Sequence, residues 1–186
     1  MTRVQTLIRD TFLTLMSQKG FDRVNVKDVL LKAGVARSSF YSHYDSKYHL
    51  RKCIEDEVLS QLSEAFLKVR LSSAGVPLTN SIANASDYYA LYYECLERNE
   101  ELVRLLLSEK NSNHFLFRLI DFVQSEQKLT REVWGARNVI PAQLLDYYTT
   151  SLSWAYVGAF SAWISSDKAT RPSPKDMGAA TSQYFG

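Results

Sequence analysis

Cysteine is scarce in this chain, which contains only Cys53 and Cys95 among its 186 residues. The two lack the close spacing of metal and redox motifs, and a chain of this length can bury a sizeable core without disulfides. We therefore expect both thiols to fill small spaces in the core. Scarce cysteine also favours a reducing compartment, which makes the cytoplasm the expected location.

A signal peptide and a membrane span are also lacking. The first residues, Met1 to Gln5, do not introduce a long apolar run. No later window approaches the roughly 20 uncharged residues that a membrane-spanning helix needs. We expect a soluble protein that is not exported.

Motifs of catalysis and metal binding are absent as well. The sequence has neither a glycine-rich phosphate loop nor a nucleophile elbow. Its three histidines, His43, His49 and His114, are not arranged with acidic or cysteine residues as metal pairs. We expect no catalytic residue, no metal site and no cofactor, so an enzyme is not predicted.

Proline is confined to positions 77, 141, 172 and 174. Most segments between these prolines carry apolar residues three and four apart, the period of a half-buried helix. This pattern predicts an all-α fold of about nine helices. We expect them at about 4–19, 25–33, 37–44, 46–71, 80–98, 100–109, 113–127 and 142–165 and after 174, with a less regular stretch before Pro141.

Positive charge is concentrated at the N-terminal end of the chain. Residues 1–52 contain ten basic and four acidic side chains, a net charge of +6, whereas the remainder contains 12 basic and 16 acidic side chains, a net charge of −4. Nucleic-acid recognition needs a local positive patch of this kind. The same segment predicts three short helices, with Asn25 as an N-cap, Gly34 in a tight turn and Phe40 facing inward, which suggests a helix-turn-helix.

Residues 25–50 resemble the DNA-binding signature of TetR-family regulators. The resemblance rests on motifs at fixed spacing: Val26-Lys27-Asp28, Ala33-Gly34-Val35, Ser39-Phe40-Tyr41, His43-Tyr44, Ser46-Lys47 and Leu50. It implies a helix-turn-helix DNA-binding domain over residues 1–48 and a helical effector-binding and dimerisation domain over residues 49–186. It also implies a homodimer that represses transcription from a palindromic operator.

The predicted third helix presents a polar outer face to DNA. Arg37, Ser38, Tyr41 and Ser42 share that face, and Arg37 is the best base reader because its guanidinium can donate twice to one guanine. By resemblance, Tyr41, His43 and Lys47 hold the DNA backbone. The complete set of expected DNA contacts is Lys27, Arg37, Ser38, Ser39, Tyr41, Ser42, His43 and Lys47.

Two positions depart from the family pattern. Ala36 stands where the family generally has Ser or Thr as the cap of the recognition helix, so one capping bond, on the order of 1 kcal/mol, is missing. Leu30 is bulkier than the usual alanine facing that helix. Both departures concern how the recognition helix is seated.

A stripe of small residues in the helix at 142–165 is the expected dimer contact. Small side chains permit close helix approach, and large apolar neighbours supply contact area. By resemblance, this helix and one at about 173–185 form a four-helix bundle with their mates. The expected contacts are Ser151, Ala155, Tyr156, Gly158, Phe160, Ala162 and Trp163, with burial inside the protomer as the alternative.

The middle of the chain is rich in aromatic residues, and in family members this region often encloses an effector pocket. Residues four apart share a helical face, so at least one pair of tyrosines is expected to point inward. The candidate pocket residues are Tyr88, Tyr89, Tyr92, Tyr93, Phe122 and Trp134, with an ordinary aromatic core as the alternative.

A narrower resemblance concerns the C-terminal half. Motifs there are similar to the TetR-like branch that includes activators of dihydroxyacetone kinase operons: Asn99-Glu100, Leu105-Leu106, Phe115, Tyr156, Gly158, Trp163 and Ser173-Pro174. This resemblance implies an activator that responds to a partner protein. A helical adaptor that does not bind DNA is a further alternative, although it would not need the net charge of +6 on residues 1–52.

Overall fold

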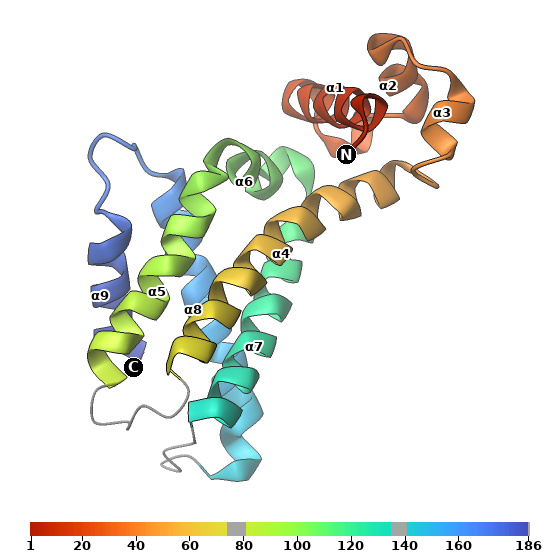
Figure 1. The fold of residues 1–186 in the computed structure, drawn as a ribbon. Coiled ribbons are helices and arrows are strands. Elements are labelled where there is room, and N and C mark those ends of the chain that lie inside the picture. Colours follow the sequence, from red (N-terminus) through yellow and green to blue (C-terminus); the bar gives the residue numbers. More distant parts are fainter. Residues whose placement is uncertain (74–80, 135–140, 186) are drawn as a thin grey trace. The chain divides into compact units, whose positions relative to one another are not determined.

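The structure is a computed structural model that describes residues 1–73, 81–134 and 141–185. Over these ranges the chain is all-α, with nine α-helices and no strand, which confirms the predicted fold class. The helices are α1 (Arg3–Lys19), α2 (Val26–Ala33), α3 (Arg37–Tyr41), α4 (Lys47–Ser73), α5 (Ser81–Arg98), α6 (Glu100–Leu107), α7 (His114–Trp134), α8 (Leu145–Ser165) and α9 (Pro174–Phe185) (Figure 1). None of the described helices is long and apolar enough to cross a membrane.

Two helix ends differ from the sequence prediction. The third helix was expected to reach Tyr44 but ends at Tyr41, and the chain then turns with the His43 and Tyr44 amides both donating to the Phe40 carbonyl at 3.0 and 2.9 Å. Helix α7 was expected to end near 127 but continues to Trp134. Residues 128–134 contain neither glycine nor proline, so nothing in the backbone stops the helix there.

The described chain divides into two compact units. The first unit comprises Met1–Val58 and Glu101–Phe115, and the second comprises Leu59–Glu100 and Leu116–Gly186. The first unit therefore combines two segments that are far apart in the sequence.

The first unit has a small core built by α1, α2, α3 and the beginning of α4. Ile8, Phe12, Val29, Phe40 and Leu50 are fully buried there. Their spacing within each helix is the three-and-four pattern of the sequence, so each helix places one apolar face in this core. Burial of these side chains fixes the orientation of α3 relative to α1 and α2.

The segment 101–115 closes the first unit through Asn111. The Asn111 side-chain oxygen accepts a hydrogen bond from the Phe21 amide at 2.8 Å, and its side-chain nitrogen donates to the Leu105 carbonyl at 2.8 Å. Gly20 lies beside it with φ of 78°, and a Cβ there would lie 2.5 Å from the Lys110 carbonyl oxygen. Both the backbone angle and the close approach therefore require glycine.

The second unit has an aromatic core, and α9 packs along α5 in it (Figure 1). Gly178 permits this packing, because a Cβ there would lie 2.5 Å from the Ser86 carbonyl oxygen and 2.6 Å from the Ala90 amide nitrogen. The Tyr93 and Thr181 hydroxyls, 3.2 Å apart, form a buried hydrogen bond between the same two helices.

The loop between α8 and α9 is held by Arg171. Its guanidinium lies 4.1 Å from the Trp163 ring centroid and donates to the carboxylates of Glu97 at 2.7 Å and Glu100 at 2.9 Å. The Arg171 hydrogen bonds are the main cause that lowers the pKa of Glu100 to about 2. A second cation, Lys168, lies 3.2 Å from the Glu100 carboxylate. This cluster of Arg171, Lys168, Glu97 and Glu100 ties the loop to the C-terminal end of α5 and the start of α6.

Candidate nucleic-acid interface

The helix-turn-helix is specified by local hydrogen bonds at both ends of α2. The Asn25 side-chain oxygen accepts from the Asp28 amide at 2.8 Å, and the Asp28 carboxylate accepts from the Asn25 amide at 3.4 Å. This reciprocal capping box begins α2. Gly34 ends it with φ of 65°, in the left-handed region, where its amide donates to the Leu30 carbonyl.

Phe40 attaches α3 to the rest of the first unit. Its side chain is fully buried and lies 5.7 Å from the Tyr44 ring centroid. Ala36, which precedes α3, makes no side-chain capping bond. The short recognition helix therefore depends on the packing of Phe40 for its position.

The outer face of α3 carries the side chains that the sequence predicted to meet DNA. Arg37, Ser38, Tyr41 and Ser42 are exposed. The Arg37 guanidinium lies 5.3 Å from the Tyr41 ring centroid, close enough for a cation–π contact that orders both side chains. A positive, polar surface of this width suits the major groove, which admits one helix.

The other candidates lie around this face in the same unit. Lys27 is exposed in the first turn of α2, and two residues are half-buried: Ser39 within α3 and His43 in the turn after it. The Ser39 carbonyl accepts from the Ser42 hydroxyl at 3.0 Å. Seven of the eight predicted DNA contacts, Lys47 excepted, are thus grouped on α2, α3 and the turn after α3.

Lys47 differs from the others because its ammonium group is already bonded within the protein. It donates to the backbone carbonyls of Phe21 at 3.1 Å, Asp22 at 3.1 Å and Val24 at 2.8 Å. Burial is the main cause that lowers the pKa of Lys47. An ammonium group has three N–H donors, so all of them are used by these carbonyls.

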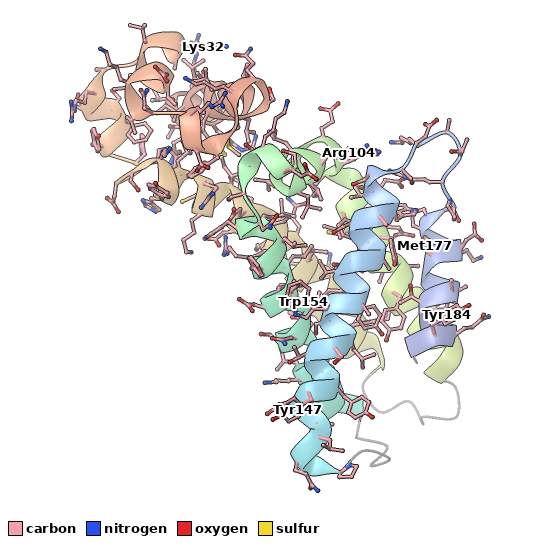
Figure 2. The ribbon with its side chains drawn as sticks, turned by 180° about the vertical axis from the view of Figure 1, so that it is seen from behind. Lys32, Arg104, Tyr147, Trp154, Met177 and Tyr184 are labelled. Carbon is pink, nitrogen blue, oxygen red and sulfur yellow. The ribbon has the colours of Figure 1, made fainter. Side chains whose placement is uncertain are left out.

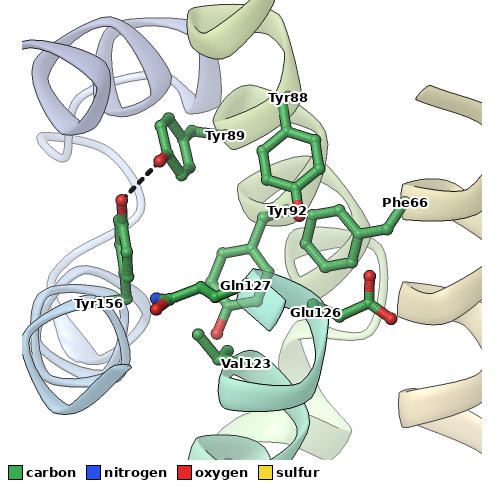
Figure 3. A pocket seen from close by; sticks show the side chains of 8 residues that line it. All are labelled: Phe66, Tyr88, Tyr89, Tyr92, Val123, Glu126, Gln127 and Tyr156. Atoms are coloured by element: carbon green, nitrogen blue, oxygen red, sulfur yellow. Dashed lines mark hydrogen bonds between the residues drawn. The ribbon is translucent and has the colours of Figure 1, made fainter. Parts of the chain in front are cut away.

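A cavity in the second unit contains part of the predicted effector pocket (Figure 3). Of the six candidates, Tyr88, Tyr89 and Tyr92 line it. Phe122 packs on Phe66, and Tyr93 bonds to α9, but neither lines the cavity. The side chain of Trp134 lies outside the part of the chain that the structure describes.

Five lining residues were not predicted as pocket residues. They are Phe66, Val123, Glu126, Gln127 and Tyr156. Tyr156, which the sequence analysis placed at the dimer interface, donates its hydroxyl to the Tyr89 hydroxyl at 2.6 Å. Val123 and Gln127 are four residues apart and occupy one face of α7, so a search of that helix for residues one turn apart would have found them.

The predicted dimer residues fall into two groups on α8. Ser151, Gly158 and Ala162 are exposed and Ala155 is half-buried, so the small stripe faces outward. The aromatic residues of that prediction are instead buried within the protomer: Tyr156, Phe160 and Trp163.

Large aromatic side chains accompany the small stripe on the surface of the second unit. On α8, Tyr147 is 73 % exposed and Trp154 is 48 % exposed, and on α9 Tyr184 is 84 % exposed. Figure 2 marks all three. Tyr147, Ser151, Trp154, Gly158 and Ala162 follow one another at spacings of three and four, and we call them the outward face of α8.

Comparison with known proteins gives one family match. Residues 8–52 match the family model described as bacterial regulatory proteins, tetR family. The matched segment contains the capping box of α2, the turn at Gly34 and all of α3.

Solved structures resemble the chain over nearly its whole length. A TetR transcriptional regulator from Streptococcus agalactiae is 21 % identical, with a TM-score of 0.62 over 98 % of this chain and 93 % of that one. A putative TetR-family regulator from Syntrophomonas wolfei is 15 % identical, with a TM-score of 0.68 over 97 % and 92 %. The regulator FadR from Bacillus subtilis, in complex with stearoyl-CoA, is 10 % identical, with a TM-score of 0.55 over 96 % and 95 %. At these identities the likeness is one of fold.

Proposed function

We propose that this chain is a member of the tetR family of bacterial regulatory proteins, whose model its residues 8–52 match, and that it represses transcription by binding a palindromic operator as a homodimer. The observation that carries this proposal is the exposed face of Arg37, Ser38, Tyr41 and Ser42 on a helix fixed by buried Phe40. Binding to chromosomal DNA makes the cytoplasm its place of action.

The side chains of the first unit have different roles in the proposed complex. Arg37 reads a guanine edge in the major groove, while Tyr41, Lys27 and His43 contact phosphates. Lys47 is a positioning residue, because its ammonium group holds the carbonyls between α1 and α2. Phosphate binding by Lys47 would require it to give up one of these bonds.

The dimer is proposed to form through the outward face of α8. Small residues at Ser151, Gly158 and Ala162 let two copies of α8 approach, and Tyr147 and Trp154 provide apolar area that water otherwise covers. A symmetric dimer holds two recognition helices at the spacing of operator half-sites, about 34–36 Å or a multiple of it.

The second unit is proposed to bind an effector that releases the operator. Its aromatic cavity supports this role, as does the FadR relative of the same fold that was crystallised with stearoyl-CoA. An effector releases DNA only if it binds the DNA-incompetent arrangement of the dimer more tightly than the competent one.

The test of DNA binding is the salt dependence of affinity for labelled fragments of the source genome. If several phosphates are contacted, the logarithm of the association constant falls steeply with the logarithm of salt concentration. Tyr41→Ala should weaken binding to every fragment, whereas Lys128→Ala, which removes an exposed cation in the second unit, should not. A helical adaptor would show no saturable binding to any fragment, and that result would refute the proposed function.

A further inference from the structure

The walls of the cavity in the second unit are flat aromatic surfaces. On one side, the Phe66 ring centroid lies 4.7 Å from that of Tyr88 and 5.9 Å from that of Tyr92. On the other side, Tyr89 and Tyr156 stack with their centroids 5.2 Å apart and their planes inclined by 28° (Figure 3). Aromatic rings associate in this way at centroid distances of about 4.5–7 Å, so the walls are suited to another flat ring.

Two polar atoms in these walls have no hydrogen-bond partner within the described chain. They are the hydroxyl oxygen of Tyr92 and the side-chain nitrogen of Gln127, and both are buried. Tyr92 as a whole is only 6 % exposed, and Gln127 extends from α7 toward Tyr156 (Figure 3). Buried donors are costly to leave unpaired, so a bound molecule that accepts hydrogen bonds from them gains affinity.

The charge of the lining disfavours an anionic ligand. Among the residues that the structure describes, the lining contains one carboxylate, Glu126, and no lysine, arginine or histidine. Burial raises the pKa of Tyr92 well above its usual value and also raises that of Tyr89, so both hydroxyls stay neutral and keep their protons. An anion would lose its hydration without meeting a cation in this wall.

The cavity is small. It holds only about 30 Å³ of free space, well below the roughly 300–1,000 Å³ typical of small-molecule sites, so its lining side chains must move to admit a ligand. One or two fused rings require less movement of these side chains than a long acyl chain with a nucleotide headgroup.

From these observations we infer that the effector is a small, uncharged, planar aromatic compound with oxygen acceptors. It stacks on the tyrosines and accepts hydrogen bonds from Tyr92 and Gln127. This inference rests on the proposed function, in which the cavity holds the effector, and it narrows the chemical class of that molecule.

The test titrates the full-length protein with three probes of similar shape and follows protein fluorescence. 7-Methoxycoumarin is uncharged and has a carbonyl acceptor, coumarin-3-carboxylate is anionic, and naphthalene has no acceptor. We expect saturable binding of 7-methoxycoumarin and at least tenfold weaker binding of coumarin-3-carboxylate. Tyr92→Phe and Gln127→Leu should each weaken 7-methoxycoumarin binding about tenfold, without changing the affinity for naphthalene.

The variants are chosen so that misfolding does not imitate the result. Tyr92→Phe removes a hydroxyl that has no hydrogen-bond partner among the described residues, so it does not threaten the fold. Tyr93→Phe is the matched control, since it removes a neighbouring hydroxyl that bonds to Thr181 outside the cavity. It should leave 7-methoxycoumarin binding unchanged.

Three results would overturn the ligand class: equal binding of the carboxylate, unchanged affinity for 7-methoxycoumarin in both variants, or no saturable binding of any probe. Operator binding measured on the same samples without probe separates the two proposals. A protein that binds 7-methoxycoumarin but no DNA refutes the proposed function alone. A protein that binds DNA but none of the probes refutes the ligand class alone.

Discussion

The ammonium group of Lys47 is bonded to three backbone carbonyls, although the sequence predicted that it would contact DNA. We predict that Lys47→Met lowers the free energy of unfolding by about 2–3 kcal/mol, because three charge-assisted hydrogen bonds to carbonyls are lost. Urea denaturation of the purified protein measures this change. Operator affinity should also fall, since the turn between α1 and α2 is no longer fixed.

The salt dependence of that affinity distinguishes positioning from phosphate contact. For Lys47→Met the slope of log K against log salt should stay as in the unmodified protein. For Lys27→Met, the matched change at an exposed lysine, it should shrink by about 0.9. A shrinkage of the same size for Lys47→Met would show that Lys47 binds a phosphate after all.

Variants of Arg37 and Tyr41 should distinguish recognition of a base from contact with the DNA backbone. Arg37→Ala is expected to relax preference at one base position, at a cost of about 1–3 kcal/mol on the preferred sequence, whereas Tyr41→Ala weakens all sequences alike. Selection from random DNA with each variant measures both effects. Uniform loss with Arg37→Ala would contradict its role as a reader.

Residue-scale prediction from sequence works where the cause is local. The cap at Asn25, the left-handed turn at Gly34 and the buried Phe40 depend on neighbours within a few positions, and all three are present. The carbonyl partners of Lys47 lie 23 to 26 residues earlier in the chain, so the sequence pattern did not show them.

At the scale of elements, the contact between α9 and α5 depends on Gly178. We predict that Gly178→Ala destabilises the protein by about 1–3 kcal/mol, although alanine favours helix, because its Cβ would meet backbone atoms that have no room to move. Ala180→Gly, at an exposed position of the same helix, should cost only the propensity difference of about 1 kcal/mol. Thermal unfolding compares them, and a stabilised Gly178→Ala protein would contradict the packing.

The cluster around Arg171 makes the second unit sensitive to acid. The pKa of Glu100 is lowered from 4.5 to about 2, so its contribution to stability is complete above pH 4.5 and is lost as the pH falls toward 2. Urea midpoints measured from pH 6 to pH 2 should therefore fall, and Glu100→Gln should flatten part of that decline. Glu101→Gln, at an exposed position, should leave it intact, and equal curves for both variants would exclude Glu100 as the cause.

Element boundaries were predicted well where glycine, proline or a cap marks them, and less well elsewhere. The observed α5, α6 and α8 begin and end within a few residues of the expected positions. The faces of α8 were harder to assign, because this helix is apolar on several sides and periodicity alone does not say which side turns outward. The stripe of small residues on α8 faces outward, while the aromatic residues of the same helix face the core: Tyr156, Phe160 and Trp163.

For the whole molecule, the proposed dimer predicts that Gly158→Arg yields a monomer. In the described part of the chain, no atom outside the adjoining stretch of α8 lies within 4 Å of a Cβ at Gly158, so arginine there leaves the fold intact but blocks a second α8. Sedimentation should show half the mass of the unmodified dimer. Operator affinity should drop at least a hundredfold, because two helix-turn-helix domains no longer bind the operator together. Glu94→Arg, an exposed change on α5, should stay dimeric, and a dimeric Gly158→Arg protein would refute this interface.

Because residues 101–115 belong to the first unit, a chimera that transfers this unit to a related protein must include them. Cutting the chain after the helix-turn-helix leaves the Phe21 amide without Asn111 and uncovers the surface at Gly20 that the Lys110 carbonyl occupies. A chimera that contains only residues 1–58 of this protein therefore lacks the contacts that Lys110 and Asn111 make with Gly20 and Phe21. A chimera that retains native DNA recognition needs both segments of the first unit, Met1–Val58 and Glu101–Phe115.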